Sequence, residues 1–107
     1  MAEIPWFYQP GVFVKEQQIN FCESLDDVNK VMSAFSQNSP KKGYEVLSQN
    51  QNCHLDVKSF TPQKIVRQLA IKTDGHDYTV SFVAINTTDE QRVFLFTTRP
   101  IKQVKQQ

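Results

Sequence analysis

The sequence is poor in several residue types that particular functions require, and glycine is the first of them. Only three glycines occur among 107 residues, too few to expect the glycine-rich loops whose backbone amides cradle phosphate groups. Paired carboxylates, a nucleophile elbow and a dinucleotide-binding fingerprint are also missing from the sequence. These absences weigh against a nucleotide-dependent enzyme and, more generally, against any familiar catalytic constellation.

An excess of charge of one sign is missing too, since the formal net charge is +1. Strong binding to nucleic acid or to an anionic membrane rests on a basic surplus, so we expect no nucleic-acid partner. Single-stranded nucleic-acid binding stays one alternative function, with bases stacked on sheet aromatics among basic side chains. The residues for it would be Lys64, Arg67, Lys72, Arg92 and Arg99 around Phe94 and Phe96.

Long apolar runs are absent, so we expect no insertion into a membrane. Residues 1–10 lack the basic start and apolar core of a signal peptide. Met1-Ala2 is compatible with a natural start of the chain, and equally with residues added by cloning in place of a removed leader.

Cysteine is scarce, and the positions of the two cysteines are the only clue to the compartment. Cys22 ends the strand-like run INFC and Cys53 begins CHLDV, with a helical segment between them. We predict a disulfide that ties the two ends of this segment together, worth roughly 3–4 kcal/mol in the chain-entropy model. A disulfide favours a periplasmic or secreted protein. Two independently buried thiols, in a cytoplasmic protein, are the alternative.

Histidine is equally scarce, which weighs against metal and thiol chemistry. A zinc site would have to draw on Cys22, Cys53, His54 and His76. The neighbours Cys53 and His54 point to opposite faces of a strand, so we expect no metal and no cofactor. A small thiol-dependent hydrolase using Cys22 and a histidine is the alternative enzyme function, and no local motif supports it.

The best-specified stretch is Lys64–Ile85, which predicts a β-hairpin about Asp74-Gly75. Asp-Gly suits the two-residue type I′ turn, which needs positive φ at both positions. Setting Thr73 opposite His76 sorts the side chains into a polar face and an apolar face, and a one-residue slip would mix them. The apolar face, on which we expect helices to dock, contains Ile65, Leu69, Ile71, Tyr78, Val80 and Phe82, with the stem of Arg67 among them.

Two short helices are predicted between the cysteines. Ser24 begins the first, with Asp27 three residues later in a capping-box arrangement. Its inward face has the helical spacing of Leu25, Val28, Met32 and Phe35. Asn38 is expected to end it, and Ser39-Pro40 begins a second helix that runs to about Gln49. Gly43 weakens that second helix, because glycine is a poor helix former.

Further strands are predicted over residues 12–21, 53–60 and 92–98, with a break near Gln17 and a turn at 61–63. The last strand is apolar on both faces, which predicts a central strand or one covered on both sides. The fold class is therefore α+β, an antiparallel sheet of four to five strands with a two-helix hairpin packed on one face. Residues 1–11 form an extended aromatic arm, 12–101 a single domain and 102–107 a polar tail.

The segments FCESLDDVNKVMSAF and GYEVLSQNQNC, followed by antiparallel strands, resemble a type of small exported bacterial protein of unknown function. In that type two cysteines bracket a short helical pair. The resemblance covers about residues 19–60 and implies an oxidising compartment, but no activity and no site residues.

These observations favour a non-enzymatic binding or accessory domain whose partner is a protein or peptide. Three surfaces are candidates: the polar face of the sheet, an open edge strand, and the aromatic arm with Trp6, Phe7 and Tyr8. For the arm, core-capping is the favoured interpretation, since aromatic residues mostly supply buried area.

Overall fold

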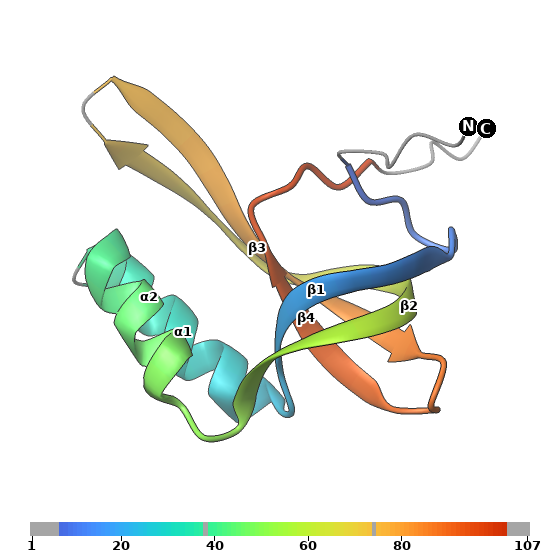
Figure 1. Ribbon diagram of the computed structural model, residues 1–107. Helices are drawn as coiled ribbons and strands as arrows, with labels where there is room; N and C mark the ends of the chain where they lie inside the picture. Colours follow the sequence, from blue (N-terminus) through green and yellow to red (C-terminus); the bar gives the residue numbers. More distant parts are fainter. Residues whose placement is uncertain (1–6, 38, 74, 103–107) are drawn as a thin grey trace.

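The computed structural model describes residues 7–37, 39–73 and 75–102, and Figure 1 shows two helices beside a strongly twisted sheet. The protein is α+β, as the sequence predicts. The elements are β1 (Val14–Cys22), α1 (Leu25–Gln37), α2 (Pro40–Gln49), β2 (Cys53–Thr73), β3 (His76–Thr87) and β4 (Arg92–Thr97).

The four strands form one antiparallel sheet that closes on itself in the order β1-β2-β3-β4. Closure comes from a short ladder between the end of β1, Asn20–Cys22, and Phe94–Phe96 of β4. The described chain has four strands and not five, because the strands predicted over 53–60 and 64–73 are one continuous strand, β2. The predicted turn at 61–63 is thus wrong, and the ladder instead absorbs Pro62 through an irregularity between Pro62 and Lys64.

The hairpin of β2 and β3 has the predicted register from its tip inward, with Thr73 opposite His76 and Arg67 opposite Phe82. Beyond Arg67 a bulge shifts the ladder by one residue, so that Ile65 pairs with Val83 rather than Ala84. One extra residue reverses the facing of every side chain after it. Ile65 therefore packs in a different cluster from Ile71 and Phe82.

Two hydrophobic clusters lie on opposite sides of β3 and β4. The interior cluster joins all four strands and contains Tyr8, Ile19, Phe21, Phe60, Val83, Ile85, Val93 and Leu95. The second cluster joins strand residues to helix residues and contains Cys22, Val28, Val31, Met32, Phe35, Leu47, Ile71, Val80, Phe82 and Phe96. Val93 and Leu95 belong to one cluster and Phe96 to the other, so both faces of β4 contribute buried residues.

The helix boundaries follow the predicted caps. The Ser24 hydroxyl accepts a hydrogen bond from the Asp27 amide, and the Ser39 hydroxyl accepts one from the Lys42 amide. Leu25 is an exception to the predicted inward face, since it is 49% exposed at the helix start. The predicted end of the first helix at Asn38 lies outside the described residues.

Gly43 has a role that its helix propensity does not reveal. A Cβ at this position would lie 2.4 Å from the ring of Phe35, far inside van der Waals contact. Gly43 thus lets α2 approach α1 closely enough for Phe35 to lie between the helices and contact Tyr44 and Phe96 as well.

Candidate functional site: an open strand edge beside Tyr44

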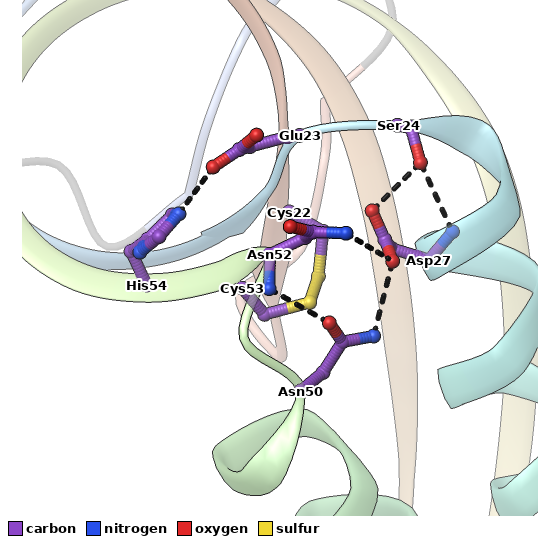
Figure 2. The surroundings of a disulfide bond; sticks show 8 residues. All are labelled: Cys22, Glu23, Ser24, Asp27, Asn50, Asn52, Cys53 and His54. Carbon is purple, nitrogen blue, oxygen red and sulfur yellow. Dashed lines mark hydrogen bonds and ion pairs between the residues drawn. A yellow bond between two sulfur atoms is a disulfide. The ribbon is translucent and has the colours of Figure 1, made fainter.

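The predicted disulfide is confirmed: Cys22 and Cys53 are joined across the paired ends of β1 and β2. Cys22 is completely buried, and both helices lie in the loop that the bond closes (Figure 2). A buried disulfide of this kind suggests an oxidising, extracytoplasmic setting.

A hydrogen-bond network surrounds Asp27 next to the disulfide, as Figure 2 shows. Asp27 is 2% exposed. Ser24 donates to Oδ2 at 2.6 Å, and the amides of Asn50 and Asn52 donate to Oδ1 at 3.1 and 3.4 Å. Burial raises the pKa of Asp27, but these hydrogen bonds and nearby Lys30 outweigh it, so the pKa is lowered. The network ties the start of α1 to the turn after α2 and has a structural role.

His54 lies on the other side of the disulfide, with its Nε2 2.5 Å from Oε2 of Glu23. Both side chains are partly exposed and line a depression with Phe21, Arg92 and Val93. Neither cysteine has a free thiol, so the oxidised protein offers no thiolate to a histidine. Within the described residues no group of three or more His, Cys, Asp and Glu side chains is arranged to hold a metal ion.

The described aromatic residues of the arm differ in how deeply they are buried. Tyr8 is 5% exposed and belongs to the interior cluster. Its ring meets Phe60 edge-on, its hydroxyl donates to Gln17 at 2.7 Å, and its backbone forms a bridge with Ile101. Tyr8 therefore caps the core, in line with the favoured interpretation of the arm. Phe7 is half-buried, Trp6 lies outside the described residues, and partner binding by the arm stays a prediction.

The residues considered for nucleic-acid stacking have other contacts. Phe96 is 8% exposed and contacts Phe35, Tyr44 and Phe82, and Phe94 is packed against the same cluster. Arg67 and Arg92 donate to the side chains of Asn29 and Asn86. The phenylalanines are therefore not displayed as a stacking surface.

The open edge arises because β3 is longer than β4. The ladder between them begins at Ser81 and Thr97, so residues 76–80 of β3 extend past β4. Successive residues of an antiparallel ladder direct their backbone groups alternately to the two sides. In a two-residue hairpin the closing pair, Thr73 and His76, is hydrogen-bonded. The backbone groups of Asp77 and Thr79 consequently face away from β2, toward the side that β4 leaves vacant.

A depression of about 770 Å³ lies along this open edge. We call it the β3-edge groove; it is lined by Tyr44, Gln68, His76, Tyr78, Thr79, Ser81 and the segment 98–101. Tyr78 and His76 present rings 5.5 Å apart, and the hydroxyls of Thr79 and Ser81 come from the opposite face of β3. The groove thus combines aromatic surface, hydroxyl and amide groups, and unpaired strand backbone.

Tyr44 links the groove to the helices. Its ring packs against Phe35 and Phe96 at centroid distances of 5.0 and 5.8 Å, while 40% of the residue stays exposed. Burial first, and hydrogen bonding with Tyr78 second, raise the pKa of Tyr44 to about 12. Tyr44 is therefore neutral at physiological pH and presents an uncharged hydroxyl beside the edge.

A second depression of about 320 Å³ lies on the other side of residues 98–99. Tyr44, Thr98 and Arg99 line both depressions, and β1 residues 17–20 form the far wall of the second one. The described ladder between β1 and β4 covers only three residue pairs, so β1 also diverges from β4 here. The end of β4 is thus the point where its two neighbouring strands separate.

Comparison with known proteins adds no functional assignment, since no family model, curated protein or solved structure matches the chain. Among the described residues no helix is both long and apolar enough to span a membrane. Tyr44 and Thr79 were not predicted as site residues. A signal for the edge was present, because the strand predicted after Gly75 is longer than the one predicted over 92–98.

Proposed function

We propose that this protein is a non-enzymatic exported domain, periplasmic or secreted, that binds a protein or peptide partner by pairing with the open edge of β3. The observation that carries the proposal is the five-residue extension of β3 past β4, along a depression of about 770 Å³. Strand addition to an open sheet edge is a general mode of peptide recognition. The buried disulfide supports export.

The surroundings of the edge favour binding over a merely solvated strand end. Exposed edges in monomeric proteins are commonly short and charged, which prevents unwanted pairing. Here the edge is flanked by Tyr78 and by the exposed part of Tyr44, and tyrosines supply large contact area at low conformational cost. Among the described residues that line the groove, the basic side chains are those of Arg99 and His76, and none is acidic.

The proposal includes the docking of the helical hairpin on one face of the sheet, with β3 and β4 beneath it. Support comes from the cluster that joins Val28, Met32 and Phe35 to strand residues, and from the stacking of Phe35 on Phe96. With that arrangement the helices hold Tyr44 at the groove and keep the hairpin from bending away.

Two proline variants on one cross-strand pair test the proposal. Thr79 and Ala70 are opposite each other, and by the same alternation their backbone amides face outward on opposite edges of the hairpin. Thr79→Pro removes an amide from the proposed edge, whereas Ala70→Pro removes its counterpart from the other edge. Proline is tolerated where the missing amide would face solvent, so both variants should keep the fold, which circular dichroism checks.

The binding measurement uses a display library of random linear octapeptides, panned against the oxidised domain. We expect binders, and we expect Thr79→Pro to weaken them at least about tenfold, since a backbone hydrogen bond contributes about 1 kcal/mol and the proline ring also obstructs the edge. Ala70→Pro should bind like the wild type. A library without binders, or equal binding by Thr79→Pro, would contradict the proposal. If Thr79→Pro does not fold, the test uses the wild-type domain and a selected peptide whose alternate backbone amides are N-methylated. An affinity equal to that of the unmethylated peptide would contradict strand pairing.

A further inference from the structure

The extension of β3 past β4 offers few backbone groups, and this restricts how a second strand can pair with it. The ladder between β3 and β4 begins at Ser81 and Thr97, so β4 already occupies the outward backbone groups of Ser81. Because outward-facing residues alternate along a strand, Asp77 and Thr79 are the two residues of the extension whose backbone groups face the open side. Strand pairing at this edge must therefore use these two residues.

The edge is complementary to itself in one antiparallel register. Two copies of the edge can be related by a two-fold axis that passes beside Asp77, Tyr78 or Thr79. An axis at Asp77 would place two carboxylates directly opposite each other, which is destabilising. An axis at Thr79 would require Ser81 of each copy, which β4 already pairs. With the axis at Tyr78, Asp77 of each copy lies opposite Thr79 of the other, and no like charges are opposed.

The side chains also match in the register centred on Tyr78. Asp77 and Thr79 are exposed on one face of β3, so the threonine hydroxyl of one copy can donate to the aspartate carboxylate of the other. On the opposite face, the two Tyr78 side chains form a cross-strand aromatic pair, which stabilises an antiparallel ladder. Both faces of the paired strands therefore gain favourable contacts.

The length of the open edge matches the strand that would fill it. In the same register, His76 of the second copy lies opposite Val80, the last residue of the extension before the ladder with β4 begins. The next residue of the second copy is Gly75, where the hairpin turns back toward its own β2. All of the extension is thus paired, and β2 and β3 of both copies form one continuous sheet.

We infer that the partner at the β3 edge is a second copy of this chain, which pairs antiparallel with β3 about a two-fold axis at Tyr78. The inference rests on the proposed strand pairing and names the partner. The net charge of +1 leaves little repulsion between the copies. Because the paired segment is short, we expect a dissociation constant on the order of 100 μM. At low micromolar concentration the isolated domain is then mostly monomeric, and its edge is open to a peptide.

Sedimentation equilibrium at concentrations from well below to well above this value tests the inference. We expect a monomer–dimer equilibrium without larger species, since the two-fold pairing uses the open edge of both copies. Thr79→Pro removes an outward amide and should weaken dimerisation at least about tenfold, whereas Ala70→Pro, on the other edge of the hairpin, should leave it unchanged. A monomer at every concentration, or a dimer that Thr79→Pro does not weaken, overturns the inference.

Charge variants of Thr79 test the register and replace Thr79→Pro if that variant does not fold. Thr79→Asp places like charges opposite each other twice in the dimer and should weaken it about tenfold, whereas Thr79→Lys places opposite charges there and should tighten it several-fold. Ala70→Asp is the control, because it changes the net charge equally but lies on β2, away from the second copy. Equal dimerisation of Thr79→Asp and Thr79→Lys overturns the register centred on Tyr78.

The outcomes distinguish this inference from the proposed function. Octapeptides whose binding depends on the Thr79 amide, selected by a chain that stays monomeric, overturn the second copy as the partner and leave strand pairing in place. A dimer that a selected octapeptide does not dissociate uses another surface, which also overturns the inference. A chain that neither dimerises nor selects octapeptides overturns both.

Discussion

Asp27 makes the sharpest prediction about stability, because its environment differs so clearly from that of its neighbour. Asp26 and Asp27 both lie in the first turn of α1, where a negative charge interacts favourably with the helix dipole. Only Asp27 is buried, with Ser24 donating to one carboxylate oxygen and Asn50 and Asn52 to the other. Replacing each residue by asparagine separates the effect of the network from that of the dipole.

We expect Asp27→Asn to lower the free energy of unfolding by about 2–3 kcal/mol. An asparagine side chain has only one acceptor oxygen, so the variant cannot accept hydrogen bonds both from Ser24 and from the side-chain amides of Asn50 and Asn52. Asp26→Asn should cost less than about 1 kcal/mol, the typical dipole contribution. Urea unfolding at pH 7, with the disulfide intact, measures both values. Equal costs for the two variants would show that the network does not act as described.

The pH dependence gives the same prediction a second test. The pKa of Asp27 is lowered in the folded protein relative to its ordinary value of 3.8, so its ionised form is favoured by folding. The resulting stability is fully present above about pH 4 to 5 and is lost as the pH falls through the folded pKa. The difference in stability between wild type and Asp27→Asn should therefore shrink below pH 4. A difference that stays constant to pH 2 would contradict the assignment of the lowered pKa to Asp27.

The disulfide and the helix contact make two further predictions. Replacing both cysteines, Cys22→Ala with Cys53→Ala, should lower the free energy of unfolding by roughly 3–4 kcal/mol, as expected for a loop of this length; chemical denaturation measures it, and a loss under about 1 kcal/mol would contradict the entropic argument. Gly43→Ala would raise helix propensity, but Gly43 is buried, and the variant should cost about 1–3 kcal/mol because the added methyl group collides with the Phe35 ring. Thermal unfolding decides the sign, and a stabilised variant would show that the helices can separate without cost.

Local signals in the sequence predicted the parts of the fold that short-range physics determines. Asp74-Gly75 implied the turn, and the alternation of apolar residues then implied the register as far as Arg67. The two caps at Ser24 and Ser39 marked where the helices begin. The disulfide also followed, because Cys22 and Cys53 stand at the ends of two predicted strands.

The missed features depend on contacts between residues far apart in the chain. The bulge between Ile65 and Arg67 lies in the part of β2 that pairs with β3 alone, and no local sequence pattern marks it. Closure of the sheet through Asn20–Cys22 and Phe94–Phe96 joins distant segments. The close approach at Gly43 depends on the position of Phe35, which the sequence does not show. From the sequence alone, Gly43 is therefore interpreted only as a poor helix former.

The candidate site was visible in the sequence only as an open edge of unspecified location. The strand lengths implied that some edge would be exposed, but the partners of each strand were needed to assign it to β3. The structure places Tyr44 of α2 where the β3-edge groove and the second depression meet. Its position depends on Gly43, the residue before it, because that glycine sets the distance between the helices.

The central claim, that the open edge of β3 pairs with an extended segment, is tested most directly by amide hydrogen exchange measured residue by residue. The amides of Asp77 and Thr79 should exchange rapidly in the isolated domain and become protected when a selected octapeptide is bound, while Ala70 on the opposite edge stays unchanged. Protection of Asp77 and Thr79 in the isolated domain, or protection confined to another surface on binding, would contradict the account.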